Sequence, residues 1–332
     1  MAVVSIRATG IAPLFRTRVI GSLFMWMVLV QTSPAQQGAE PLSRFTFTEY
    51  HMGVDTRLVV YAPSQSVAES ACAAAFERIA KLDSIMSDYQ IHSELNRLCD
   101  KAGGEPLPVS PDLFKVLQES MRVSRLSNGL FDVTVGPLVR LWRKARKTGV
   151  LPSPRAIRQA RALVGWRRVT FDTASRSVRL AIPGMKLDLG AIGKGYADDE
   201  AQHVLKAHGI TRALVDMGGD IVVSDPPPGT NGWTFDVPNA GKSMRFKDCA
   251  VSSSGDTEEF AIIGRKRYSH VINPHTGQAL THRVQSTVIG PNGSITDPVS
   301  TAMTLVSPRV RGRILRAYPG TRAYVRVLRS DE

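Results

Sequence analysis

The amino-acid sequence predicts an α+β fold whose strands pair mainly in antiparallel sheets. Short segments of alternating apolar and polar residues follow one another closely, which is typical of hairpins. Segments with apolar residues at helical spacing lie between them. Strand–helix–strand units, which would indicate a parallel sheet, are few. These observations favour mixed, largely antiparallel sheets with packed helices, and no domain boundary is obvious.

The helices and strands of the first half are predicted from the spacing of apolar residues and from the positions of glycine and proline. Alternation predicts strands, and apolar residues at helical spacing predict helices. Proline favours the first turn of a helix, and Asn128-Gly129 is typical of a helix C-cap. Strands are predicted at 45–53 and 56–61, helices at 67–86, 111–126 and 154–163, and a loop or short helix at 89–98.

The second half is predicted to be richer in strands. Residues 169–180 predict a hairpin that turns near 173–176, and a helix is expected from Tyr196 to Ala207. The strand at 213–217 is expected to stop at Gly218-Gly219-Asp220. Further strands are predicted at 233–237, 250–253, 259–263, 284–289 and 322–328.

Residues 1–35 predict a cleaved signal peptide. Arg7, Arg16 and Arg18 are the only charges there, and they precede or flank the start of the apolar run 19–30. That run is shorter than the roughly 20 residues that span a bilayer. Small residues at 33–35 then offer a cleavage site. We therefore expect a periplasmic protein with one domain at 36–332; an uncleaved anchor at the inner membrane is the alternative.

Composition narrows the class of protein. The 332 residues are 43% hydrophobic, as in globular proteins that bury a core. Losing the three signal-peptide arginines lowers the formal net charge from +13 to +10, which suits an anionic ligand, a membrane surface or nucleic acid. Export and the scatter of basic residues argue against nucleic acid. The one dense basic cluster, 140–147, also fits a solvated helix face. Three cysteines without metal-ligand spacing are typical of small buried side chains.

The most informative motif is the run 187–196, LDLGAIGKGY. A strand-like segment ends at Asp188, a glycine-rich turn contains Lys194, and a helix follows. Glycines allow close approach of a ligand, and helix-start N–H groups with a lysine attract phosphate. An ordinary strand-to-helix connection is the alternative. A lysine at a helix start opposes the helix dipole, which a bound anion would relieve.

A second polar segment begins at Asp297. Asp297-Pro298 predicts the start of a final helix, with Asp as N-cap and Pro at N1. Thr301 follows four residues later on the same helix face. Both side chains offer the oxygen ligands that Mg2+ prefers. N-capping alone also explains Asp297.

Two further segments contain candidate side chains. His270 follows a predicted strand and precedes a proline-containing turn, where it suits a general base or a structural role. Residues 128–137 offer Asp132 and backbone groups to a ligand, or form a helix end that leads into a buried strand.

Taken in order, these segments resemble the ApbE family, the FAD:protein FMN transferases. The resemblance covers nearly all of the chain after the signal peptide. Each motif is weak alone, and their number and order make the match specific. The matching segments are 50–53, 86–96, 129–139 (GLFDVTVGPLV), 187–196, 214–220, 253–255, 268–277 (YSHVINPHTG) and 296–302.

The resemblance implies an ApbE-like fold, as a single catalytic unit or one with two subdomains. It implies Mg2+-dependent cleavage of FAD, transfer of FMN to a Thr or Ser hydroxyl of a target flavoprotein, and release of AMP. Such acceptors include membrane-associated redox proteins. The residues implied to contact FAD are Met52, Tyr89, Leu130, Phe131, Asp132, Asp188, Lys194 and Ile272.

The resemblance also assigns metal ligands and a base. The Ala191 carbonyl, Asp297 and Thr301 would hold Mg2+, and His270 would take the acceptor proton. Ser300 stands where some members have another Asp, which weakens a second metal site. Two alternatives stay open: an FAD pyrophosphatase with water as acceptor, and a periplasmic flavin-binding protein without turnover.

Overall fold

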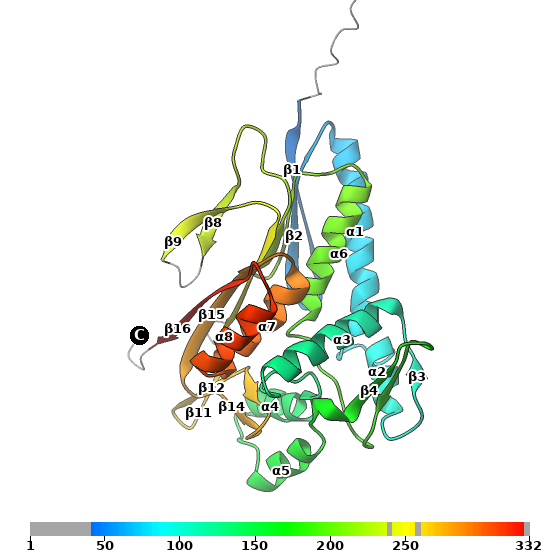
Figure 1. The fold of residues 1–332 in the computed structure, drawn as a ribbon, viewed down its shortest axis with the longest axis vertical. Coiled ribbons are helices and arrows are strands. Elements are labelled where there is room, and N and C mark those ends of the chain that lie inside the picture. The colour runs from blue at the N-terminus through cyan, green and yellow to red at the C-terminus, as the bar shows by residue number, and fades with distance from the viewer. Residues whose placement is uncertain (1–40, 238–240, 256–259, 329–332) are drawn as a thin grey trace, which may run out of the picture. The chain divides into compact units, whose positions relative to one another are not determined.

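An antiparallel sheet of seven strands forms the centre of the fold (Figure 1). The computed structural model describes residues 41–237, 241–255 and 260–328. The strand order is β1-β2-β6-β7-β10-β15-β16, and each neighbouring pair runs antiparallel. The strands are β1 Ser43–His51, β2 Val54–Ala62, β6 Ala213–Met217, β7 Asp220–Val223, β10 Cys249–Gly255, β15 Arg283–Gly290 and β16 Arg322–Leu328.

Short sheets and hairpins complete the strands. One small sheet has the order β3-β5-β4, and three pairs form separate hairpins, β8–β9, β11–β12 and β13–β14. Their bounds are β3 Leu107–Pro108, β4 Val169–Asp172, β5 Ser177–Leu180, β8 Trp233–Val237, β9 Lys242–Phe246, β11 Phe260–Ile263, β12 Lys266–Ser269, β13 Ile272–Asn273 and β14 Gln278–Ala279.

Helices pack against this framework. Figure 1 shows α1 and α6 running side by side, with α7 and α8 beside the far strands of the large sheet. Serine side chains cap several N-termini; Ser64 accepts from the Val67 N–H, and Ser110 from that of Leu113. The helices are α1 Gln65–Met86, α2 Glu94–Asp100, α3 Pro111–Leu126, α4 Gly136–Thr148, α5 Pro154–Ala162, α6 Gly193–Ala207, α7 Gly293–Leu305 and α8 Pro308–Ala317, with a 3-10 turn at Trp166–Arg168.

The main core lies between the large sheet and α1, α3, α6 and α7. Leu58 of β2, Ile79 of α1 and Leu117 of α3 are fully buried in it. A separate apolar cluster gathers Trp142 of α4 with Tyr268 and Ile272. Burying these side chains contributes roughly 1.5–3 kcal/mol each, which holds the polar turns between the helices in fixed places.

The predicted α+β class is confirmed, and so are the hairpins at 45–61 and 169–180. The predicted burial of the cysteines is confirmed for Cys72 and Cys99, whereas Cys249 is half-buried, and all three thiols are unpaired. Residues from Pro41 onward form one compact unit. No helix among residues 41–237, 241–255 and 260–328 is long and apolar enough to cross a bilayer. The predicted signal peptide, and Glu259 of a predicted strand, lie outside the described residues.

Two predicted helix starts are wrong, and one of them is that of α6, which starts at Gly193 and not at Tyr196. The helix expected to start at Asp297 starts at Gly293 with Asn292 as N-cap, so Asp297 and Pro298 lie inside it, and α8 is a later helix. The strand at 213–217 stops as predicted, because β6 ends at Met217, just before Gly218-Gly219. Both have positive φ, +62° and +93°, and they form the tight turn of a hairpin in which Asp220 pairs with Met217.

Candidate active site

The turn after Leu187 joins two parts of the chain that sequence analysis placed in one site. The Asp188 N–H donates to the Val133 carbonyl at 2.8 Å, which fixes the turn beside the segment 130–133. Asp188 Oδ1 accepts from the Gly190 N–H at 2.9 Å. The helix α6 then begins at Gly193. The turn therefore has a defined shape before any ligand is present.

Arg143 links Asp188 to Tyr89. Its guanidinium donates to Asp188 Oδ2 at 3.0 Å, pairs with Asp88, and lies 4.2 Å from the centre of the Tyr89 ring. Burial raises the pKa of Asp188, as does repulsion from Asp88, whereas Arg143 lowers it. His270 is close enough to lower it too. Arg143 thus contacts both Tyr89 and Asp188, and His270 lies near Asp188.

The starts of α6 and α7 touch through two glycines. A Cβ on Gly195 would lie 2.2 Å from the Gly293 carbonyl oxygen and 2.7 Å from Asp297 Cβ. A Cβ on Gly293 would lie 2.2 Å from the Gly195 carbonyl oxygen. Only glycine fits at either position, because real Cβ atoms do not approach that closely. The contact brings Asp297 against the first turn of α6.

Asp297 satisfies a backbone N–H in that turn. The Gly195 N–H donates to Asp297 Oδ2 at 3.0 Å. Gly195 is the third residue of α6, whose N-cap is Ile192, so its N–H has no partner within the helix. Ala191 precedes that N-cap, and its carbonyl lies outside the hydrogen-bond ladder of the helix. Thr301 lies one turn beyond Asp297, and its hydroxyl donates to Ser254 Oγ at 3.3 Å.

Lys194 is paired within the protein. Its ammonium bonds Asp220 at the start of β7. Burial alone would lower the pKa of Lys194, but Asp220 and Asp297 raise it above the usual range. The lysine therefore stays charged, and part of its charge is already balanced by a carboxylate.

Three buried carboxylates surround this one lysine. Asp297 is 4% exposed, and burial followed by the charge of Asp220 raises its pKa to about 8. Asp198 is fully buried, and neither of its oxygens has a hydrogen-bond partner among the residues that the structure describes. Burial and then Asp220 raise its pKa well above the ordinary value. One ammonium cannot balance three carboxylates, so the cluster favours either retained protons or an added cation.

The donors near Asp297 fit Mg2+. A backbone carbonyl just before the start of α6, a buried carboxylate with a raised pKa and the Thr301 hydroxyl are hard oxygen ligands. Over the described ranges, no group of three or more His, Cys, Asp or Glu side chains is arranged to hold a metal. The expected set has only one carboxylate, so diphosphate oxygens and water would supply the remaining ligands.

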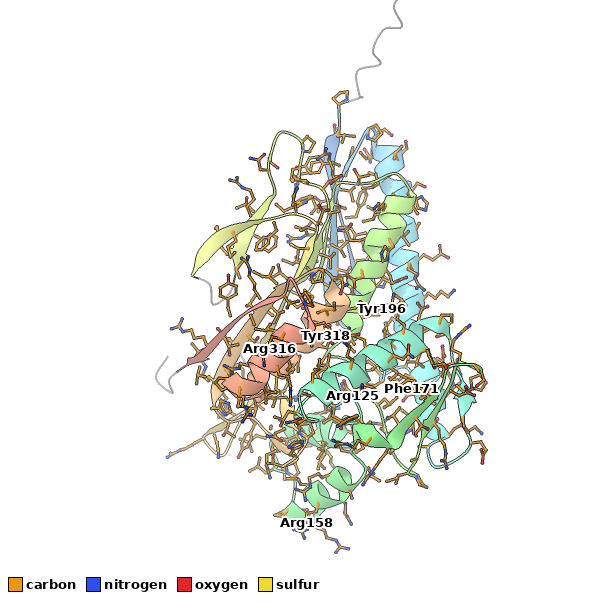
Figure 2. All side chains as sticks on the ribbon, viewed as in Figure 1. Arg125, Arg158, Phe171, Tyr196, Arg316 and Tyr318 are labelled. Carbon is orange, nitrogen blue, oxygen red and sulfur yellow. The ribbon has the colours of Figure 1, made fainter. Side chains whose placement is uncertain are left out.

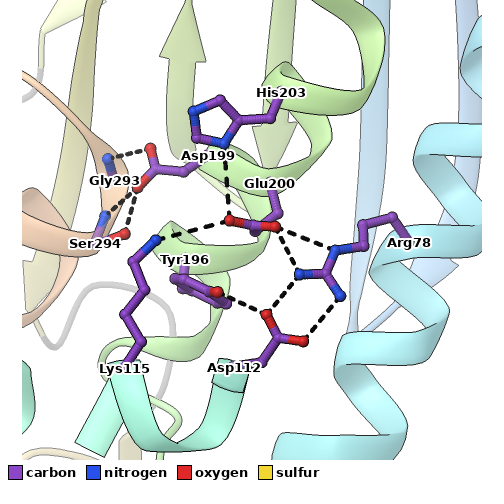
Figure 3. Close-up of polar contacts among 9 residues, drawn as sticks. All are labelled: Arg78, Asp112, Lys115, Tyr196, Asp199, Glu200, His203, Gly293 and Ser294. Carbon is purple, nitrogen blue, oxygen red and sulfur yellow. Dashed lines mark hydrogen bonds and ion pairs between the residues drawn. The ribbon is translucent and has the colours of Figure 1, made fainter. Parts of the chain in front are cut away.

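A polar network fixes α6 against its neighbours (Figure 3). Arg78 of α1 makes paired hydrogen bonds to Asp112 of α3, at 3.0 and 2.5 Å, and bonds Glu200 at 2.6 Å. The Tyr196 hydroxyl donates to Asp112 at 2.7 Å. The network therefore holds the turn of α6 that follows Lys194.

Asp199 of α6 holds the start of α7 in place. It accepts from the Gly293 N–H at 2.7 Å and the Ser294 N–H at 2.8 Å, and from the Ser294 hydroxyl (Figure 3). A carboxylate there satisfies N–H groups at the positive end of the helix dipole. One helix thus caps the other.

The remaining predicted residues are placed less directly. Both oxygens of buried Asp132 are occupied, by Thr134 and by the Trp166 N–H, so the side chain shapes its own loop. Phe131 and Ile272 are buried, and Leu130 is half-buried. Met52 occupies the β1–β2 turn with φ +49° and packs on the main core.

Sequence reasoning missed three side chains of this site. Arg143 was grouped with a basic cluster that suited a solvated helix face, yet it is half-buried against Asp88 and Asp188. Asp220 appeared only as the end of a strand. Asp198 had no distinguishing pattern at all. A charged residue within a predicted buried helix face was the available clue for Asp198.

The fold and the contact between the starts of α6 and α7 define a class of protein. It is an α+β enzyme in which buried carboxylates that favour a cation lie beside a glycine-rich loop of the kind that binds phosphate. Comparison with known proteins is more specific. The model of the ApbE family matches residues 52–325, so the chain belongs to the ApbE family. The predicted resemblance is confirmed.

Named relatives agree. The FAD:protein FMN transferase of Klebsiella pneumoniae (strain 342) is 29% identical, over 91% of this chain and 89% of that protein. The one of Escherichia coli (strain K12) is 30% identical, over 70% of each. The solved structure of the flavin transferase ApbE from Vibrio cholerae superposes with a TM-score of 0.76 at 26% identity, covering 88% of this chain and 96% of that one.

Proposed function

We propose that this chain is an Mg2+-dependent FAD:protein FMN transferase. FAD is the substrate, and the acceptor is a Thr or Ser hydroxyl of a target flavoprotein. Family membership and the names of the relatives support flavin transfer. The observation that supports the metal-assisted reaction is the contact of Gly195 with Gly293, which places the buried Asp297 carboxylate against the first turn of α6.

The metal ligands are the Ala191 carbonyl, Asp297 and Thr301. When bound there, Mg2+ would neutralise charge on the diphosphate of FAD. Asp297 has to lose its proton to bind a cation, and its pKa of about 8 in the metal-free protein makes this step sensitive to pH. Lys194, shared with Asp220, keeps a positive charge at the same helix start.

The flavin contacts come from the other side of the turn. Tyr89 is 74% exposed and its ring lies against Arg143, and an exposed aromatic ring can stack on the rings of a flavin. Asp188 and the segment 130–132 are joined by the bond to the Val133 carbonyl. Met52, Lys194 and Ile272 complete the proposed contacts.

Transfer of FMN is a displacement at phosphorus. The acceptor hydroxyl oxygen attacks the phosphorus on the FMN side of the diphosphate and forms a new phosphoester bond. The bond from that phosphorus to the bridging oxygen breaks, and its electron pair leaves with AMP. The hydroxyl proton passes to His270, which can act as a base near neutral pH.

The test uses the full chain with FAD, Mg2+ and a purified acceptor domain. Mass spectrometry should find the acceptor heavier by one FMN phosphoester, with one AMP released per adduct. AMP release that proceeds equally without acceptor would instead indicate an FAD pyrophosphatase. Tight FAD binding with no product under excess Mg2+ would indicate a flavin-binding protein.

We also propose that residues 1–35 direct export to the periplasm, where the acceptors are membrane-associated redox proteins. The apolar run 19–30 and the small residues after it support export. Cell fractionation with N-terminal sequencing should find a periplasmic chain that begins near residue 36. A chain that retains Met1 in the membrane fraction would contradict cleavage.

A further inference from the structure

Three arginines of α8 line a hollow beside the end of α3. The hollow has a volume of about 440 Å³, and its lining residues are Asn128, Arg309, Val310, Arg313 and Arg316. Arg309, Arg313 and Arg316 are spaced by four and three residues, so they share one face of the helix. We call this site the arginine hollow.

One of the three guanidinium groups is fixed by the backbone. Arg313 Nε and Nη2 both donate to the Leu126 carbonyl, at 2.9 and 2.6 Å. Leu126 is the last residue of α3, where carbonyls lack helical partners and the dipole is negative. The arginine therefore satisfies the helix end and is held in place at the same time.

The other two guanidinium groups are exposed. Arg309 and Arg316 lie on the surface of α8, and no ion pair joins either to a carboxylate in the part of the chain that the structure describes. None of the lining residues is acidic. Cations gathered on one helix face repel one another, and a bound anion removes that repulsion.

We propose that the arginine hollow binds a phosphate group. Guanidinium groups match phosphate with paired N–H donors, which a set of lysines would not do. The volume of about 440 Å³ exceeds that of a phosphate ion, so the hollow has room for a phosphate that carries a substituent. A small soluble phosphate ester and the headgroup of an anionic lipid share this chemistry.

The site is distinct from the one proposed for FAD. None of Ala191, Asp188, Lys194, Asp297 and Thr301 lines it. The inference therefore stands whether or not the chain transfers FMN, and its test needs no activity measurement.

The experiment compares two double variants of the full chain. Arg309→Gln with Arg316→Gln removes two charges from the hollow and leaves the Arg313 bonds intact. Arg155→Gln with Arg158→Gln removes two exposed charges from α5 (Figure 2). The probes are inorganic phosphate, followed by thermal denaturation, and vesicles of phosphatidylglycerol or of phosphatidylcholine, followed by co-sedimentation.

If the ligand is a soluble phosphate, phosphate at about ten times its Kd should raise the Tm of the unmodified chain by about 3 °C. The α5 variant should show the same rise, and the Tm of the α8 variant should not change. If the ligand is a lipid headgroup, the α8 variant should bind phosphatidylglycerol vesicles about 30-fold more weakly than the unmodified chain, because each arginine near an anionic surface strengthens binding about fivefold. The unmodified chain and both variants should bind phosphatidylcholine vesicles equally. Equal behaviour of the two double variants with both probes would overturn the proposal.

Discussion

Replacing Asp198 by Asn should stabilise the folded chain, by an amount that grows as the pH rises. Asp198 is fully buried on α6, and both of its oxygens lack partners. Burial and the neighbouring charge of Asp220 raise its pKa well above the ordinary 3.8. The folded chain thus keeps a proton on this group at pH values where the unfolded chain releases it.

The sign and size follow from that difference. A folded-state pKa above the unfolded value makes ionisation favour unfolding, so the penalty is absent below pH 3.8 and grows above it until the folded-state pKa is reached. Each pH unit in that window contributes about 1.4 kcal/mol. Between pH 5 and pH 7, the stability of the Asn variant relative to the unmodified chain should increase by up to about 2.7 kcal/mol.

Urea denaturation at pH 5, 6 and 7, with a chelator present, measures the effect. Asp55→Asn is the matched control, because it removes one exposed carboxylate, on β2, by the same chemical change. Its stability curve should run parallel to that of the unmodified chain. If the Asp198→Asn curve is also parallel, Asp198 is ionised in the folded protein and the reasoning fails.

Three further outcomes are expected. Asp297→Ala should lower the rate of FMN transfer by about 100-fold or more while the chain stays folded, since it removes the one proposed carboxylate ligand; transfer at an unchanged rate would exclude Asp297 from the metal site. Gly195→Ala should cost about 1–3 kcal/mol in urea denaturation, because its Cβ would lie 2.2 Å from the Gly293 oxygen, whereas Gly312→Ala, in an open part of α8, should be neutral or stabilising. Arg78→Met should cost roughly 2–3 kcal/mol by breaking the bonds to Asp112 and Glu200, less than for a fully enclosed pair because the side chain is 20% exposed; an unchanged urea midpoint would mean that α6 is held by packing alone.

Local patterns were sufficient for every strand of the large sheet except β7, and for most helices. Ser110-Pro111 and Ser153-Pro154 start helices as expected, because a serine cap and a proline at N1 act within one turn. The same rule failed at Asp297-Pro298. There the cap is Asn292, assisted by Asp199 from a helix that lies 94 residues earlier. A carboxylate that arrives through tertiary packing leaves no local pattern to recognise.

The candidate site shows the same limit. Two parts of the site could be predicted from the sequence, the run 187–196 and the pair Asp297 and Thr301. In each, the residues that suit a phosphate or a metal lie within a few positions of one another. Arg143 and Asp220 could not be predicted, because their roles depend on which strand or helix lies opposite. Asp220 in particular owes its position to the Gly218-Gly219 turn, which returns the chain as β7 and pairs Asp220 with Met217.

The contact between Gly195 and Gly293 also bears on the thermodynamics of ligand binding. Each residue occupies the space that a side chain on the other would need, so the two helix starts are in direct backbone contact in the folded chain. The conformational entropy of bringing them together is therefore lost when the chain folds. A ligand that spans both helix starts meets a preorganised surface, and its affinity is not reduced by having to order them.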